Sequence, residues 1–84
     1  MEFTIDCTDI HSPQELHRAI AGALSFPDWY GHNLDALYDC LCGLTGITSL
    51  VFADWDCVEG FAAGFHRVLT DAELANPQLS ITFE

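Results

Sequence analysis

The segment Phe26–Gly43, FPDWYGHNLDALYDCLCG, decides the fold because it joins a loop to the start of a helix. Asn33 is a favourable N-cap residue, and Leu34, Leu37 and Leu41 follow it at helical spacing. The glycine that closes the segment is suited to end such a helix. We therefore predict a helix from Asn33 to about position 43 with one buried leucine stripe.

Three other segments predict β-strands. Glu2–Cys7 and Leu79–Phe83 alternate apolar and polar residues, which is the pattern of a strand with one buried face. Ile47–Ala53 is a short apolar run that is partly β-branched, and it predicts a strand covered on both faces. Because helical segments separate these strands, we expect parallel pairing with crossover connections.

Two further helices are predicted. Ser12–Glu15 is a capping box with proline at the first helical position, and apolar residues follow on one face as far as Leu24. A last helical pattern runs from about Asp56 to Ala75, with Gly60 and Gly64 as points where it could break. Its core side is formed by Val58, Phe61, Phe65, Val68 and Leu69 or Leu74.

The order β-α-α-β-α-β predicts a single α/β domain over residues 1–84, with a three-stranded parallel sheet packed mainly on one side by about three helices. The composition is strongly acidic: 13 Asp and Glu face two arginines and no lysine, and the formal net charge is −11. Such a charge repels nucleic acid and anionic membranes and favours a basic partner, although solubility alone could explain it.

No apolar run is long enough to span a membrane, and no secretory signal precedes the first strand. We therefore expect a soluble cytoplasmic protein without a cofactor. The four cysteines, at positions 7, 40, 42 and 57, include no C-x-x-C pair, so we expect reduced, mostly buried thiols and no zinc site.

Asp35 and Asp39 are the unusual feature of the central helix. They lie four residues apart, so two like charges face each other across one turn at a cost of about 0.2–0.5 kcal/mol. The helix dipole favours Asp35 in the first turn, but Asp39 lies beyond it. On a helical wheel both share one flank with Cys42, beside Tyr38.

We interpret this flank as a surface for a cation or a cationic partner, with simple solvation of both acids as the alternative. Trp29 and Tyr30 in the loop and Tyr38 on the helix favour a protein partner, since tryptophan and tyrosine are typical interface residues. Tyr30 and Tyr38 could instead be half-buried core residues.

The stretch Trp29–Leu41, WYGHNLDALYDCL, resembles the signature segment of the barstar family of ribonuclease inhibitors, in which an aromatic pair and GxNLDALWDCL open the inhibitory helix. The resemblance implies a small α/β fold with a three-stranded parallel sheet. It also implies an immunity protein and not an enzyme. Such a monomer would form a 1:1 complex with a basic, small secreted guanyl-type ribonuclease or ribonuclease toxin.

The resemblance also implies roles for individual residues. Asp39 matches the main inhibitory carboxylate, which pairs with arginines and the catalytic histidine of the nuclease, and Asp35 matches a second contact. Trp29 takes the place of an interface tyrosine, and Gly31 and Asn33 belong to the binding loop. The full set of expected partner-binding residues is Trp29, Gly31, Asn33, Asp35, Tyr38, Asp39, Cys42, Leu44 and Asp71.

The sequence departs from the family pattern at several of these positions. Tyr38 replaces the usual tryptophan, and Leu44 stands where another aromatic residue is common. Asp71 only loosely matches an acidic contact late in the last helix, and Glu73 competes for that role. The segment before the last helix is short, which suggests that a helix is missing or fused.

Other functions remain open from the residues alone. The chain could be a barstar-like module for a different basic protein, since fold does not fix function. His32, Asp35 and Asp39 are spaced so that they could share a metal ion, and a cysteine of the helix could pair with His32 as a nucleophile. The other histidines, at positions 11, 17 and 66, are interpreted as surface or helix-face residues.

Overall fold

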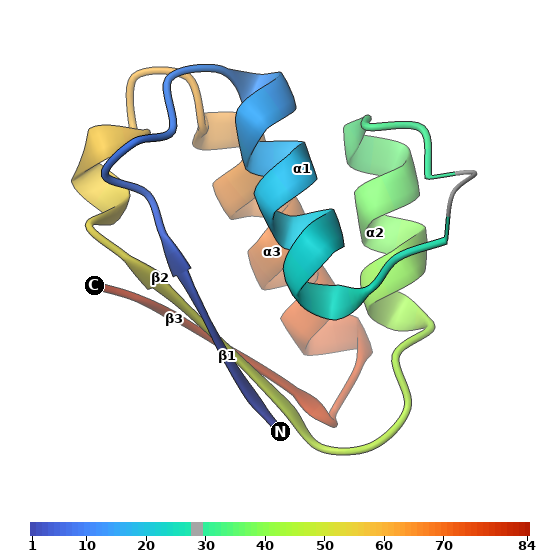
Figure 1. Cartoon of the computed structure of the whole chain (residues 1–84). Helices are drawn as coiled ribbons and strands as arrows, with labels where there is room; N and C mark the ends of the chain where they lie inside the picture. Colours follow the sequence, from blue (N-terminus) through green and yellow to red (C-terminus); the bar gives the residue numbers. More distant parts are fainter. Residues whose placement is uncertain (28–29) are drawn as a thin grey trace.

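The computed structural model describes residues 1–27 and 30–84. Its strands β1 (Glu2–Asp6), β2 (Thr48–Ala53) and β3 (Leu79–Phe83) form one parallel sheet with β2 in the centre. The helices α1 (Pro13–Leu24), α2 (Leu34–Cys42) and α3 (Ala63–Ala75) lie on one side of this sheet (Figure 1). The expected β-α-α-β-α-β order and one-sided parallel sheet are confirmed.

The sheet has one buried face and one open face. Ile5 pairs with Phe52 and Phe52 with Phe83, so these three side chains form a row on one face, and all three belong to or pack against the core. Along β2, buried and half-buried residues alternate. The prediction that this strand is covered on both faces is therefore wrong, because helices pack on one face only. Ile47, which we placed in the strand, precedes it and is 79% exposed.

Local capping sets where two of the helices begin. The Ser12 hydroxyl accepts a hydrogen bond from the Glu15 N–H at 3.2 Å, and the Glu15 carboxylate accepts one from the His11 N–H at 3.0 Å. The Asn33 side chain accepts from the Ala36 N–H at 2.8 Å. Both predicted N-caps are confirmed, and each satisfies N–H groups that have no partner inside the helix.

The segment between β2 and α3 differs from the prediction. A short 3₁₀ helix covers Trp55–Cys57, and α3 begins only at Ala63, so the helical pattern is broken before Gly64. Leu69 is fully buried, whereas Leu74 is 85% exposed, which settles the choice between them for the core.

Within the described residues, no helix combines the length and the apolar character needed to cross a bilayer.

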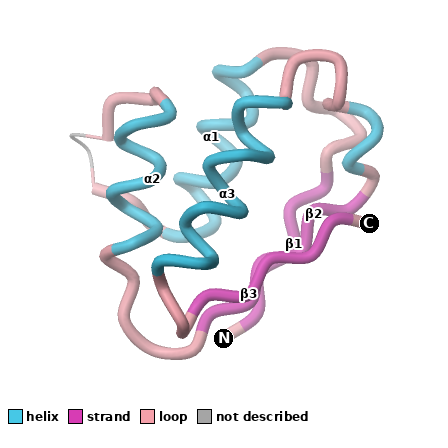
Figure 2. The backbone as a smooth tube through the Cα atoms, turned by 180° about the vertical axis from the view of Figure 1, so that it is seen from behind, coloured by secondary structure: helices cyan, strands magenta, loops and turns pink. Residues whose placement is uncertain are grey.

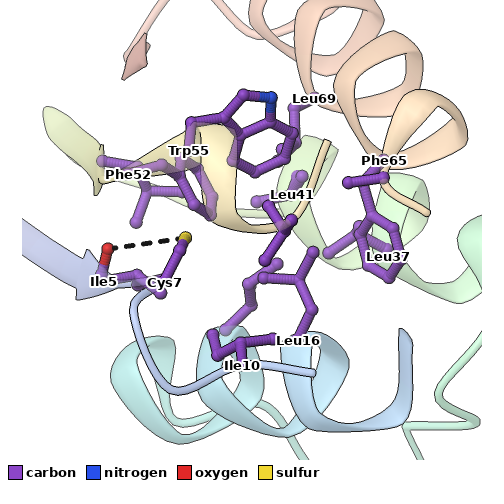
Figure 3. Close-up of a cluster of buried hydrophobic side chains, with 14 of the residues drawn as sticks. Ile5, Cys7, Ile10, Leu16, Leu37, Leu41, Phe52, Trp55, Phe65 and Leu69 are labelled. Atoms are coloured by element: carbon purple, nitrogen blue, oxygen red, sulfur yellow. Dashed lines mark hydrogen bonds between the residues drawn. The ribbon is translucent and has the colours of Figure 1, made fainter. Parts of the chain in front are cut away.

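The core lies between the sheet and the helices. Figure 3 shows Ile5 and Phe52 of the sheet facing Leu16 of α1, Leu41 of α2 and Leu69 of α3. Ile5 is 4% exposed and the other four side chains are fully buried. Helix α2 lies farthest from the sheet and packs against α3 (Figure 2). Its outer flank is therefore free to face solvent.

The four cysteines are free thiols, but they are less buried than expected. Only Cys7 is buried, Cys40 and Cys42 are half-buried, and Cys57 is exposed. Burial, with the negative charge of Asp6 as a second cause, raises the pKa of Cys7 to about 11, so this thiol stays protonated at neutral pH. Burial also raises the pKa of Cys40, which disfavours the thiolate that a nucleophile would need.

Candidate protein-interaction site

An open hollow between α2 and α3 brings three carboxylates together. We call it the acidic hollow; its volume is about 500 Å³, and it is lined by Leu34, Asp35, Tyr38, Asp39, Val68 and Asp71. Four of the residues that sequence reasoning assigned to partner binding therefore meet in one place. Val68 is a lining residue that sequence reasoning had placed in the core.

Contacts at both ends of α2 set the shape of the acidic hollow. The buried side chain of Asn76, at the end of α3, donates hydrogen bonds to the carbonyl of Leu41 at 3.0 Å and to that of Leu44 at 3.2 Å. At the other end, a Cβ on Gly64 would lie 2.9 Å from Cδ1 of Leu34, so α3 approaches α2 closely there. Sequence reasoning missed this role of Asn76.

The charges of the acidic hollow are not balanced by the chain's own cations. Asp35, Asp39 and Asp71 are all exposed. Among the described residues neither arginine lines the acidic hollow, and Arg18 instead borders a separate depression beside α1. Three like charges on one concave surface attract a cationic group and repel an anionic one.

Asp71 and Glu73 have different surroundings. The carboxylate of the half-buried Glu73 accepts a hydrogen bond from the backbone N–H of Ile81 in the edge strand β3, at 2.6 Å. Asp71 is exposed and lines the acidic hollow. The geometry therefore favours Asp71 over Glu73 as a partner-contacting acid, since the carboxylate of Glu73 is already engaged.

Tyr38 supplies a hydrogen-bond donor among the acids. Its side chain is 36% exposed. A hydrogen bond with the Cys42 side chain is the main cause that raises the pKa of Tyr38, and the negative charges of Asp71 and Asp39 add to it. The phenol therefore remains neutral at physiological pH and keeps its hydrogen. Cys42 is half-buried and is not one of the residues that line the acidic hollow.

The loop that leads into α2 is fixed by its own hydrogen bonds. Asn33 caps α2 with its side-chain oxygen, and its side-chain nitrogen donates to the carbonyl of Gly31 at 3.3 Å. His32, between them, has a left-handed backbone with φ of 50°. Trp29, expected as an interface residue, lies outside the described residues.

Leu44 lies on the opposite side of Asp39 from the acidic hollow. It lines a second depression of about 310 Å³, which we call the Leu44 hollow. Its other lining residues come from the end of α1, the turn after it and the end of α2: Leu24, Ser25, Phe26, Pro27, Asp39, Cys40 and Gly43. Asp39 therefore borders both hollows.

Tyr30 and His17 belong to the core. Tyr30 is 6% exposed, and its hydroxyl oxygen lies 2.5 Å from Nδ1 of His17, which is 4% exposed. The proposal that Tyr30 contributes to an exposed aromatic patch is therefore wrong, and the alternative that it is a core residue is confirmed. His17, which we interpreted as a surface or helix-face residue, lies on the buried face of α1. Burial is the main cause that lowers the pKa of His17, and the nearby His32 is the second. His11 and His66 are exposed as expected.

The residues proposed for a shared metal ion do not face one another. The ring of His32 stacks on that of His17, with centroids 6.1 Å apart and planes 5° from parallel, whereas the two acids line the acidic hollow. In the part of the chain that the structure describes, no three His, Cys, Asp or Glu side chains are grouped as metal ligands.

Comparison with known proteins agrees with this fold. The family described as Barstar (barnase inhibitor) matches residues 1–83, and the chain belongs to that family. A protein of Bacillus subtilis (strain 168), described as "Putative ribonuclease inhibitor YrdF", is 51% identical over 39 residues. The aligned segment covers 46% of this chain and 43% of that protein, so the chain spans less than half the length of this relative.

Proposed function

We propose that this chain inhibits a ribonuclease with a basic active site by placing the acidic flank of α2 over that site. The observation that carries the proposal is the meeting of Asp35, Asp39 and Asp71 in one hollow, lined by neither arginine of the described chain. Membership in the barstar family supports the nuclease as the class of partner. We infer an immunity role, in which a monomer binds a small secreted ribonuclease or ribonuclease toxin in a 1:1 complex and thereby protects the producing cell.

The mechanism follows from the charge of the partner. A ribonuclease must hold phosphate groups, so its active site carries arginine, lysine or protonated histidine. Carboxylates presented in place of the phosphates accept the same charge-assisted hydrogen bonds, and these bonds strengthen as water is excluded. In this mechanism Asp39, near the middle of the flank, takes the most buried position in the complex. Asp35 and Asp71, which line the same hollow, add further contacts, and Tyr38 provides an aromatic surface beside them.

Titration of the purified protein into a panel of guanyl-specific secreted ribonucleases tests the proposal, with hydrolysis of a fluorogenic RNA as the readout. At least one enzyme should be inhibited stoichiometrically. For that enzyme, Asp39→Ala should weaken inhibition by a factor of roughly 100 to 5,000, because removing one partner of a desolvated ion pair costs about 3–5 kcal/mol.

Asp9→Ala is the matched control, since it removes one exposed carboxylate from the turn after β1 and leaves the acidic hollow intact. It should change inhibition less than threefold. Equal inhibition by Asp39→Ala and the unmodified protein would refute the role of this carboxylate even if inhibition itself were real. Absence of inhibition across the whole panel at micromolar excess would favour the alternative, a module of this fold that binds another basic protein.

A further inference from the structure

Another hollow lies at the start of α3, at the opposite end of that helix from Asn76. We call it the Trp55 hollow; its volume is about 360 Å³, and it is lined by Trp55, Glu59, Ala62, Ala63 and His66. None of these residues lines the acidic hollow. The Trp55 hollow is therefore a surface separate from the proposed nuclease-binding site.

The start of α3 offers backbone donors to this hollow. Its N-cap is Ala62, which has no side-chain oxygen and makes no capping hydrogen bond, and its first helical residue is Ala63. The N–H groups of Ala63, Gly64 and Phe65 have no acceptor within the helix. Because Ala62 and Ala63 line the Trp55 hollow, these donors are available there, and the helix dipole favours a negative group beside them.

The indole of Trp55 is an independent indication that the hollow takes a ligand. This side chain is 6% exposed, yet no described residue accepts a hydrogen bond from its indole N–H. Within the described chain, no fully buried side-chain nitrogen or oxygen lacks a partner, so the indole nitrogen belongs to the small part of Trp55 that water reaches. In Figure 3 it lies on the side of the ring turned away from Cys7 and Leu41. The Trp55 hollow thus contains an unused donor from an otherwise buried residue.

Aromatic packing fixes two walls of the Trp55 hollow. The ring of Phe83, at the end of β3, lies 4.7 Å from that of Trp55 in an edge-on arrangement, measured between centroids. The same ring lies 4.5 Å from that of His66, with the two planes 26° apart. The ring nitrogens of the exposed His66 can donate or accept a hydrogen bond at the hollow. The recognition groups are therefore held in place before a ligand arrives.

Acidic residues near the Trp55 hollow disfavour a simple anion as its occupant. Glu59 lines the hollow, and a hydrogen bond from the Phe61 N–H to the Val58 carbonyl, at 3.1 Å, turns the chain between this acid and α3. The backbone carbonyl of Glu84 accepts a hydrogen bond from the Trp55 backbone N–H at 2.9 Å, so a second acidic residue is close. These acids repel a ligand that carries only a negative group, whereas they attract a positive group next to it.

We propose that the Trp55 hollow binds a free α-amino acid. The carboxylate of the ligand accepts hydrogen bonds from the N–H groups at the start of α3 and from the indole N–H of Trp55, and its ammonium group lies beside the carboxylate of Glu59. One carbon joins the two charged groups of an α-amino acid. Such a ligand suits a site in which the acid precedes the N-cap of the helix by only three residues.

Titration with L-alanine and with two analogues at matched ionic strength tests the proposal. Propionate lacks the ammonium group, and ethylammonium lacks the carboxylate. In ¹H–¹⁵N spectra at pH 7, the indole N–H of Trp55 and the amides of Ala63, Gly64 and Phe65 should shift saturably with one dissociation constant. L-alanine should bind at least about threefold more tightly than either analogue, because only L-alanine satisfies both charged parts of the site.

Two substitutions separate the contributions of the two parts. Trp55→Phe removes the indole donor and should weaken the binding of L-alanine about three- to tenfold, since a hydrogen bond to a charged group is lost. Glu59→Gln, at an exposed position, should abolish the preference for L-alanine over propionate. Glu2→Gln is the matched control, because it removes an exposed acid at the amino end of β1 and should change neither result.

Equal binding of L-alanine and propionate by the unmodified protein would overturn the proposal, because the site would then recognise only a negative group. Absence of saturable shifts would overturn it as well, and so would an unchanged preference in Glu59→Gln. If Trp55→Phe does not fold, Glu59→Gln decides the question alone, since that residue is exposed. Because no nuclease is present, these outcomes are independent of whether the chain inhibits one.

Discussion

Asp39→Asn should make the protein more stable although it removes the central charge of the proposed site. Asparagine and aspartate have similar helix propensities, so the change isolates the charge. Loss of the repulsion from Asp35 contributes about 0.2–0.5 kcal/mol. Asp39 also lies in the last turn of α2, which ends at Cys42, and a negative charge there opposes the helix dipole by about 0.3–1 kcal/mol. The sum is a gain of about 0.5–1.5 kcal/mol, or a rise in Tm of about 2–12 °C for a chain of this size.

Urea unfolding at pH 8, followed by circular dichroism at low and at high salt, measures this gain. The matched variant is Asp35→Asn, which relieves the same repulsion but loses a favourable interaction with the N-terminal end of the dipole. It should be neutral or destabilising. The gain from Asp39→Asn should shrink in 1 M salt, where the Debye length is about 3 Å. If Asp39→Asn proves less stable than the unmodified protein, or if Asp35→Asn gains as much, then α2 does not carry the electrostatic strain that we assign to it.

Two further substitutions test contacts that hold the site in place. Tyr30→Phe removes the buried hydrogen bond between the Tyr30 hydroxyl and His17 and should lower the free energy of unfolding by about 0.5–1.5 kcal/mol at pH 8, as measured in urea. Tyr38→Phe, at an exposed position, should change it by less than about 0.5 kcal/mol, and equal losses in the two variants would argue against the buried bond. Glu73→Ala should cost about 1–2 kcal/mol in the same assay, because the N–H of Ile81 loses a charged acceptor. Glu73→Gln, which keeps an acceptor oxygen, should recover part of that loss; a neutral Glu73→Ala would show that the bond contributes nothing.

The parts of the fold that could be predicted from the sequence depend on short-range signals. The cap hydrogen bonds of Ser12 and Asn33 join residues only three positions apart, so the sequence around each cap contains both partners. The alternation of β1 and β3 and the leucine spacing of α2 are likewise local patterns. The pairing of Asp35 and Asp39 on one helix flank follows from the same periodicity.

The parts that could not be predicted depend on contacts between distant residues. Tyr30 is buried because His17, 13 residues earlier, supplies its hydrogen-bond partner. Asn76 fixes α2 through a carbonyl 35 residues away, at Leu41. Asp71 and Glu73 are both acidic and lie two positions apart, so the sequence alone does not distinguish them. The carboxylate of Glu73 is engaged because β3 places the N–H of Ile81 beside it. The helix predicted from Asp56 fails for a related reason, since the chain turns at Val58–Phe61 before α3 can begin.

Asp39 borders both the acidic hollow and the Leu44 hollow. In the proposed mechanism, the charge that attracts a partner and the shape that selects it therefore depend on different residues. A surface that covers this carboxylate also meets the end of α1 on one side and α3 on the other. In the proposed mechanism, exchanges at Leu24 or Val68 would therefore change which surfaces fit, while Asp39 still supplies the attraction. In the proposed mechanism, the residues that line these two hollows could therefore change as the partner's surface changes during evolution, while Asp39 is retained.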